Sequence, residues 1–202
     1  PPRRTGRTID RLDSAKALVM QRRLFLALPC LIFAACDQAE APFRNTQLLR
    51  PTFGKQLNLD DHHGQARSLA DFSGKVVILF FGYTSCPDVC PTMLSRLAEV
   101  MKVLGPDAAR VQVLFVTLDP ARDSAQRLKD FVPWFEPSFL GLRGDEKQTR
   151  AVADDFRVVS TRKEVGSEIG YVLDHSAGAY VFDPAGKLRL YVSDKASVED
   201  IA

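Results

Sequence analysis

Six consecutive apolar residues, followed closely by a pair of cysteines, constrain the fold of this chain more than any other feature. The run Val76–Phe81 consists of β-branched, aliphatic and aromatic residues. Because the run is continuous rather than alternating, both faces of the predicted strand must be buried, as in the centre of a sheet. The next loop contains Cys86 and Cys90, and an apolar stripe at helical spacing then runs from Met93 to Leu104. The sequence therefore predicts a central strand, a cysteine loop and a helix, in that order.

Strand and helix signals alternate along the rest of the chain. Asp123 and Gln126 have the spacing of a helix capping box. Residues 157–170 are polar and predict a loop or a small hairpin. The order predicts an α/β fold, a thioredoxin-like sandwich with a central mixed sheet and flanking helices. The other expected strands are Leu57–Leu59, Val111–Leu118, Phe139–Leu142, Ala177–Phe182 and Leu188–Val192, and the other expected helices are a turn at Ser68–Phe72, a helix from Asp123 towards Val132, Glu146–Phe156 and a helix from Ser197.

The N-terminal segment has the pattern of an export signal. Arg22 and Arg23 precede the uncharged run Leu24–Ala35, which is too short to cross about 30 Å of hydrocarbon but is typical of a secretory signal. Small residues then lead to Cys36, as in the bacterial lipoprotein box, in which the cysteine carries the lipid. An uncut anchor and ordinary cleavage are the alternatives. All three place the domain outside the cytoplasm, at the periplasmic face of the cell membrane.

These features divide the chain into four parts. Residues 1–19 contain no Met and no apolar period, so we expect translation to begin at Met20 and this stretch to be a non-native or upstream extension. Residues 20–36 form the signal or anchor segment, and residues 37–52 form a tether. Residues 53–202 form one domain.

The distribution of charge argues against nucleic-acid binding. Of 27 basic and 25 acidic residues, seven basic and two acidic ones lie in residues 1–36, so residues 37–202 keep 20 basic and 23 acidic groups and a net charge of −3. A weakly acidic domain without aromatic residues inside a basic patch lacks the electrostatic footprint of a nucleic-acid binder. We therefore expect no nucleic-acid partner.

Only Cys86 and Cys90 belong to the predicted domain. Two cysteines in an exported domain of this size are not a disulfide framework, so they form a local redox or metal site unless both are inert and buried. Three intervening residues place the sulfurs about one helical turn apart, where they could share a metal ion or form a disulfide after a small movement. Free N–H groups at the start of the following helix favour thiolate over thiol.

Two later segments contain further candidates. Asp119 follows the strand predicted at Val111–Leu118, at the edge where open α/β sheets place their sites, with a turn or cap as the alternative role. His175 lies in a segment just before a strand, where a thioredoxin-like fold places a loop opposite the cysteines. Two thiolates and one imidazole suit trigonal Cu(I) and could complete a distorted Cu(II) site, whereas structural zinc normally takes four protein ligands.

His62 and His63 lie in a predicted turn. We expect both to be exposed turn residues, with an auxiliary copper contact as the alternative. We expect Arg122 to pair with a nearby acid rather than to bind a substrate.

Three segments resemble the signature blocks of the SCO (SenC/PrrC) family of copper-binding assembly proteins: FFGYTSCPDVCP, VTLDPARDS and YVLDHSAGAYVFDPAG. The resemblance runs from about Phe53 to Val192. It implies a membrane-tethered, thioredoxin-like protein that delivers copper towards the binuclear copper centre of cytochrome c oxidase, or reduces the cysteines of that centre. The implied partners are the copper-bearing subunit of the oxidase and other copper chaperones. Carried onto this sequence, the implied copper ligands are Cys86, Cys90 and His175, and the implied supporting acids are Asp88 and Asp119, with Asp174 as a further candidate beside the histidine.

Two functions remain open at this point. The protein is either a metallochaperone without catalytic turnover, or a thiol–disulfide oxidoreductase that reduces the oxidase copper site or another exported partner. The two are linked, because an oxidised Cys86–Cys90 disulfide offers no thiolate to Cu(I) or Cu(II). Peroxidase activity at a cysteine is a more distant alternative.

Overall fold

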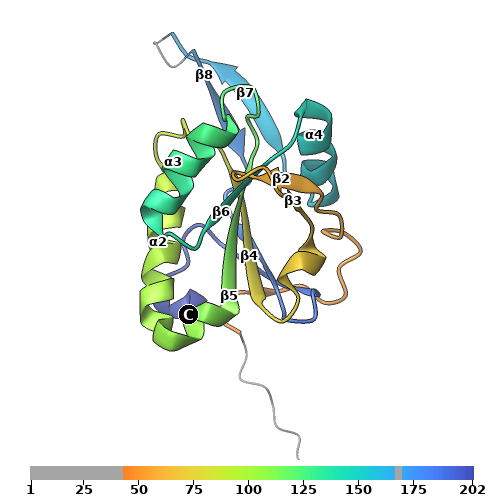
Figure 1. Ribbon diagram of the computed structural model, residues 1–202, viewed down its shortest axis with the longest axis vertical. Helices are drawn as coiled ribbons and strands as arrows, with labels where there is room; N and C mark the ends of the chain where they lie inside the picture. The colour runs from red at the N-terminus through yellow and green to blue at the C-terminus, as the bar shows by residue number, and fades with distance from the viewer. Residues whose placement is uncertain (1–42, 167–169) are drawn as a thin grey trace, which may run out of the picture. The chain divides into compact units, whose positions relative to one another are not determined.

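The centre of the molecule is an eight-stranded sheet with the strand order β1-β10-β9-β4-β5-β6-β2-β3 (Figure 1). The structure is a computed structural model that describes residues 43–166 and 170–202. The predicted extension, the signal segment with Cys36 and the first part of the tether lie outside the described residues. The strands of the sheet are β1 (Thr46–Gln47), β2 (Leu59–Asp61), β3 (Ala66–Arg67), β4 (Val76–Gly82), β5 (Val111–Thr117), β6 (Leu140–Arg143), β9 (Ala179–Phe182) and β10 (Leu188–Val192).

Strand β4 lies in the middle of the sheet, as predicted. It pairs in parallel with β5 and antiparallel with β9, so the sheet is mixed. Leu79, Phe80 and Phe81 are fully buried, which explains the continuous apolar run. Burial of side chains of this size contributes roughly 1.5–3 kcal/mol each, so this strand anchors the core on both faces of the sheet.

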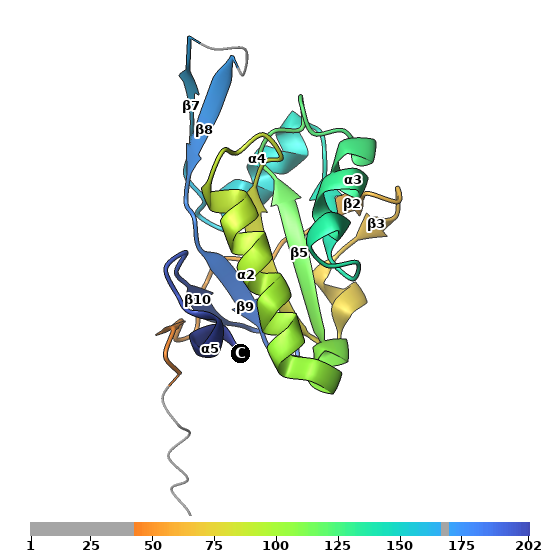
Figure 2. The same ribbon diagram turned by 90° about the vertical axis from the view of Figure 1, so that its left-hand side faces the viewer.

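Helices cover both faces of the sheet (Figures 1 and 2). Leu97 of α2 and Leu128 of α3 belong to the buried cluster on one face, together with Phe115 of β5. Val152 of α4 and Phe72 of η1 belong to the cluster on the other face. The predicted mixed sheet with flanking helices is confirmed. The helices are α2 (Val89–Leu104), α3 (Ala125–Phe135), α4 (Glu146–Asp155) and α5 (Val198–Ile201), with 3₁₀ helices η1 (Leu69–Phe72) and η2 (Gly105–Arg110).

Strands β7 (Ser160–Glu164) and β8 (Tyr171–His175) form a separate antiparallel pair. This hairpin projects beyond the main sheet (Figures 1 and 2). The polar residues 157–170, predicted as a loop or small hairpin, contribute the first strand of this hairpin, β7. The segment with His175, predicted as a loop, is its second strand, β8. Because side chains alternate along a strand, those of Tyr171, Leu173 and His175 share one face of β8.

Two predicted boundaries near the start of the domain differ from the structure. Residues 43–52 were assigned to the tether, yet they contribute β1, which pairs with β10. The strand predicted at Leu57–Leu59 begins only at Leu59 and continues to Asp61.

Among the described residues, no helix has the length and apolar character needed to cross a bilayer.

The helix boundaries near the predicted site also differ. Helix α2 begins at Val89 rather than Met93, so Cys90 lies in its first turn. Helix α3 is capped by Ser124, whose hydroxyl accepts the N–H of Arg127; the prediction that Asp123 caps this helix was wrong. The helix also continues two residues past Pro133, to Phe135, although Pro133 has no N–H to donate to the carbonyl oxygen of Lys129.

Candidate metal centre

The cysteine loop connects the buried end of β4 to the start of α2. Cys86 is half-buried in the loop, and its N–H donates to the carbonyl oxygen of Tyr83. Cys90 is fully buried in the first helical turn. A Cβ atom at Gly82 would lie 2.7 Å from the Cys90 sulfur, so only glycine lets the strand approach the thiol this closely.

His175, at the end of β8, brings its ring to the two sulfurs. Its Nε2 lies 3.5 Å from Sγ of Cys90, and the ligand atoms of Cys86, Cys90 and His175 all lie within 4.8 Å of one another. Its Nδ1 lies 2.9 Å from the carbonyl oxygen of Ser176, which can only accept, so Nδ1 carries the proton. In the neutral form of the ring, this tautomer has its lone pair on Nε2, where it faces the sulfurs and is available to a metal ion.

The two cysteines have opposite protonation preferences. The thiol of Cys90 donates to Cys86 and lowers the pKa of Cys86 far below that of an ordinary thiol; burial opposes this shift, and His175 and the N–H groups of Asp88 and Cys90 reinforce it. The same hydrogen bond, together with burial and the charge on Cys86, raises the pKa of Cys90. The pair therefore presents one partly accessible thiolate and one buried thiol.

Tyr83 holds β8 against the cysteine loop. Its hydroxyl oxygen accepts the N–H of Leu173 at 3.2 Å, and its ring packs edge-on against the His175 ring with centroids 6.0 Å apart. The side chain is 1% exposed, and this burial raises its pKa. Tyr83 thus links the strand that carries the histidine to the loop that carries the cysteines.

Asp119 acts on the same strand from the end of β5. Its carboxylate accepts the hydroxyl of Tyr171 at 2.8 Å and pairs with the guanidinium of Arg122. That guanidinium also stacks on the Tyr171 ring at 3.6 Å and donates to the Tyr171 carbonyl oxygen. The pairing expected for Arg122 is confirmed. Asp119 therefore contacts the start of β8, and any support that it gives to His175 is indirect.

Asp123 supports the cysteine loop through hydrogen bonds from Thr84. It was not identified from the sequence as part of the site. Its fully buried carboxylate accepts hydrogen bonds from the N–H and hydroxyl of Thr84 and from the hydroxyl of Thr117. Thr84 lies two residues before Cys86, so this network fixes the path of the loop. The available signal was an acidic residue close behind a buried strand, the same signal that identified Asp119.

The other two predicted acids lie at the margin of the site. Asp88 is exposed, immediately before α2, and its carboxylate accepts the hydroxyl of Thr92 at 3.4 Å. Asp174 is exposed and forms an ion pair with Lys163 on β7. Because Asp174 alternates with His175 along β8, its side chain lies on the opposite face from the ring.

His62 is buried, so the prediction that it is an exposed turn residue was wrong. Its Nδ1 accepts the N–H of Gly141 at 3.0 Å, which places the proton on Nε2. Nε2 then donates to Nε2 of His63, 2.9 Å away. Both ring nitrogens of His62 are engaged in hydrogen bonds, and this arrangement leaves no lone pair for an auxiliary copper contact. His63 is exposed, as predicted.

The burial of His62 predicts that the domain loses stability in acid. Burial lowers the pKa of His62 below its ordinary value of 6.5; the charges of His63 and Lys129 act in the same direction, and Asp61 acts against them. As the pH falls below about 6.5, His62 binds a proton more readily in the unfolded chain than in the folded chain. The free energy of unfolding therefore falls with the pH. Urea denaturation at about pH 7.5 and about pH 5.5 should show a smaller pH dependence for His62→Gln than for wild type. An equal dependence would contradict this role.

Comparison with known proteins identifies a family whose sequences match this chain. The family model described as SCO1/SenC matches residues 45–202. The human protein named Protein SCO2 homolog, mitochondrial, is 36% identical over 163 residues, which cover 79% of this chain and 61% of the relative. The chain thus spans less than two thirds of the length of that relative.

Solved structures share the fold. Copper-bound ScoI of Bradyrhizobium japonicum has a TM-score of 0.68 and 34% identity, covering 74% of this chain and 94% of that one. BsSco, described as having a disulfide switch and as a member of the Sco family of cytochrome c oxidase assembly proteins, has a TM-score of 0.60 and 21% identity, covering 77% of this chain and 94% of that one. At that identity, the second likeness bears on the fold alone.

Proposed function

Because the chain belongs to the SCO1/SenC family, we propose that it is a membrane-tethered metallochaperone that carries copper for assembly of the binuclear copper centre of cytochrome c oxidase. The observation that carries the proposal is the convergence of Cys86, Cys90 and His175. Copper binding by the Bradyrhizobium relative supports it. Membership of the SCO1/SenC family supports it too, since that family is described as one of cytochrome c oxidase assembly proteins.

The donor set fits copper as cargo. Two thiolate sulfurs and one neutral imidazole nitrogen are soft or borderline ligands, which favour Cu(I) and can also hold Cu(II). Among the described residues, the group that could hold a metal ion has these three members, whereas structural zinc prefers four. Cys86 is the accessible entry point because it is half-buried and thiolate-like. Cys90 has to release its proton when the metal binds.

Redox state then controls loading. Formation of the Cys86–Cys90 disulfide transfers two electrons to an oxidant such as a partner disulfide, releases the single proton held by the thiolate–thiol pair, and leaves no thiolate for the metal. A two-electron reductant restores the Cys86 thiolate and the Cys90 thiol, after which copper can bind. The protein therefore takes up copper only when reduced and releases it when oxidised.

Reduced protein is expected to bind one Cu(I) per chain, and protein oxidised to the Cys86–Cys90 disulfide is expected to bind none. The test is metal analysis after gel filtration under anaerobic conditions, with a chromophoric Cu(I) chelator as competitor. Arg162→Gln, on the hairpin beside the site, is the matched control and should bind as wild type does, because Arg162 offers no ligand atom to copper. Copper bound equally by reduced and oxidised protein would refute the proposal.

One observation favours a second candidate function, thiol–disulfide exchange. Cys86 is partly accessible and Cys90 beside it is fully buried, which is the arrangement of an attacking and a resolving cysteine; the lowered pKa of Cys86 agrees with this. In this alternative the metal-free pair would reduce the cysteines of the oxidase copper site or of another exported partner, and would itself become the disulfide. Rapid reduction of a partner disulfide by metal-free protein would favour this function.

The proposed setting is the periplasmic face of the cell membrane, with Cys36 as the lipid-carrying residue. The apolar run Leu24–Ala35 and the small residues before Cys36 support it. The proposed partners are the copper-bearing subunit of the oxidase and a copper chaperone that donates the metal. Mass analysis of the N-terminal peptide of the membrane-bound protein tests the anchor. An unmodified cysteine would exclude it.

A further inference from the structure

An open groove of about 920 Å³ lies at the end of the main sheet away from the cysteines. The turn between β9 and β10 borders it, and Gly74, just before β4, donates its N–H to Pro184 in that turn. The groove therefore adjoins the start of β4, whereas Cys86 follows its end. The seven residues of β4 separate these two ends by about 23 Å.

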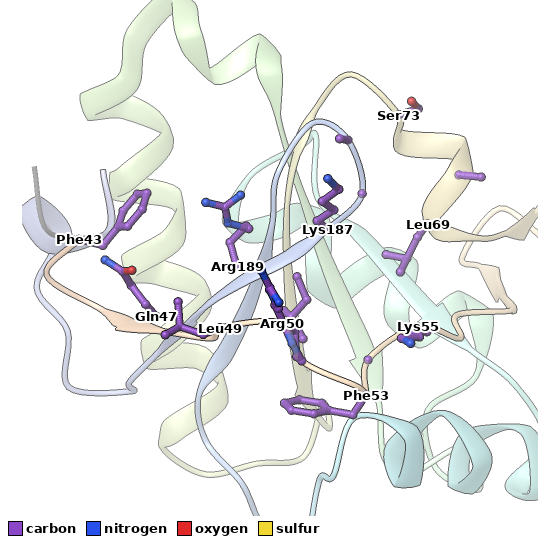
Figure 3. A pocket seen from close by; sticks show the side chains of 16 residues that line it. Phe43, Gln47, Leu49, Arg50, Phe53, Lys55, Leu69, Ser73, Lys187 and Arg189 are labelled. Atoms are coloured by element: carbon purple, nitrogen blue, oxygen red, sulfur yellow. The ribbon is translucent and has the colours of Figure 1, made fainter. Parts of the chain in front are cut away.

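The groove is strongly cationic. Arg50, Lys55, Lys187 and Arg189 line it, and none of the lining residues that the structure describes is acidic (Figure 3). Among the described residues, the structure gives an ion pair to only one of the four: Arg189 lies 3.4 Å from Asp183. The groove thus has a net positive charge that its own walls do not neutralise.

Apolar side chains flank these cations and face solvent. Leu49 is 86% exposed and Phe43 is 48% exposed, and both line the groove (Figure 3). Arg50, directly after Leu49, has φ +53° and precedes Pro51, although residues before proline normally adopt extended backbone. Backbone strain of this kind tends to be kept where a binding surface needs it. In this chain the strained residue is Arg50, which directly follows the exposed Leu49.

We propose that this groove is the face by which the domain contacts an anionic lipid bilayer. The four cations would bind headgroup phosphates, while Leu49 and Phe43 would enter the interfacial layer. A soluble anion would give no role to two exposed apolar side chains. Their combination with cations is the pattern that favours a membrane surface.

The length of the chain before the groove agrees with this assignment. Seven residue steps separate Cys36 from Phe43 and can span at most about 25 Å. If Cys36 carries the lipid, as proposed above, Phe43 stays within that distance of the bilayer. The charge and exposure of the groove do not depend on that assumption. The orientation that results turns the cysteine loop away from the lipid.

The test uses the full 202-residue chain, reconstituted in phosphatidylcholine vesicles with or without about 30% phosphatidylglycerol. A membrane-impermeant amine reagent labels the lysines, and peptide mass spectrometry gives the rate at each one. Each cation close to an anionic leaflet favours the bound state about fivefold, so Lys55 and Lys187 should react about fivefold or more slowly on anionic vesicles. The exposed Lys147 and Lys163, near the other end of the sheet, should react at equal rates on both.

A double variant distinguishes binding through the groove from nonspecific adsorption of the protein to anionic vesicles. Leu49→Ser combined with Arg50→Gln changes two exposed residues and should abolish the protection while leaving copper stoichiometry at the wild-type value. Copper stoichiometry thus reports on the proposed function separately. Equal labelling on both vesicle types, or equal slowing of Lys147 and Lys163, would overturn the proposal. Protection by inorganic phosphate without vesicles would overturn it in favour of a soluble-anion site.

Discussion

His175→Ala is expected to weaken Cu(I) binding by about a hundredfold or more while sparing disulfide exchange at Cys86–Cys90. Even groups that only orient a metal ligand are worth about 10–100-fold in affinity, and this change removes a ligand itself. The sulfurs remain in place because Cys86 is held by the cysteine loop and Cys90 by α2. Competition with a chromophoric Cu(I) chelator measures the affinity. Reaction of the oxidised pair with glutathione measures the exchange rate.

Asp174→Ala is the matched control for this variant. It changes the adjacent residue of β8, whose side chain is exposed and paired with Lys163, so copper affinity should stay within about twofold of wild type. Wild-type affinity in His175→Ala would exclude the imidazole from the site. Loss of disulfide exchange in His175→Ala would show instead that the change had disturbed the cysteine loop.

Asp123→Ala is expected to lower the free energy of unfolding by about 3–5 kcal/mol. The variant leaves the N–H and hydroxyl of Thr84 and the hydroxyl of Thr117 buried without their acceptor. Hydrogen bonds to a buried carboxylate are worth about 1.5–3 kcal/mol each, and the charge of Asp123 also carries a desolvation cost that the variant recovers. Urea denaturation followed by circular dichroism gives the value.

Asp130→Ala, on the exposed side of α3, is the control for Asp123→Ala. Its carboxylate accepts a single hydrogen bond, from Gln126, so we expect a change within about 0.5 kcal/mol. If Asp123→Ala were as mild as this control, the network under the cysteine loop would not determine stability. The loop would then have to be held by the hydrophobic contacts of Tyr83 and Cys90.

The central part of the site could be predicted because its signals are local. The run Val76–Phe81 marks a strand buried on both faces, and the apolar stripe from Met93 to Leu104 marks the helix after the cysteine loop. The structure confirms the strand and the helix, although α2 already begins at Val89. The place of His175 followed from the topology of the predicted fold, since the segment before β9 returns to the end of β4.

The errors arose where tertiary contacts decide between neighbouring residues. Asp123 and Ser124 are both good helix caps, and nothing nearby in the sequence shows that Thr84 and Thr117 bind the first of them. His62 follows two aspartates and precedes a turn glycine, which favours exposure; its burial depends on Gly141, 79 positions away.

The strand β8 had a signal that was overlooked. Tyr171, Val172 and Leu173 are consecutive aromatic, β-branched and aliphatic residues, a composition that favours a strand over a loop. Residues 43–52 had too weak a pattern to distinguish a short edge strand from a tether, because β1 contains only two residues.

X-ray absorption at the copper edge of the Cu(I)-loaded, reduced protein tests the central claim most directly. The account predicts two sulfur scatterers and one imidazole nitrogen, with the nitrogen signal lost in His175→Ala and one sulfur lost in Cys86→Ser or Cys90→Ser. A spectrum without an imidazole contribution, or one that is unchanged in these variants, would contradict it.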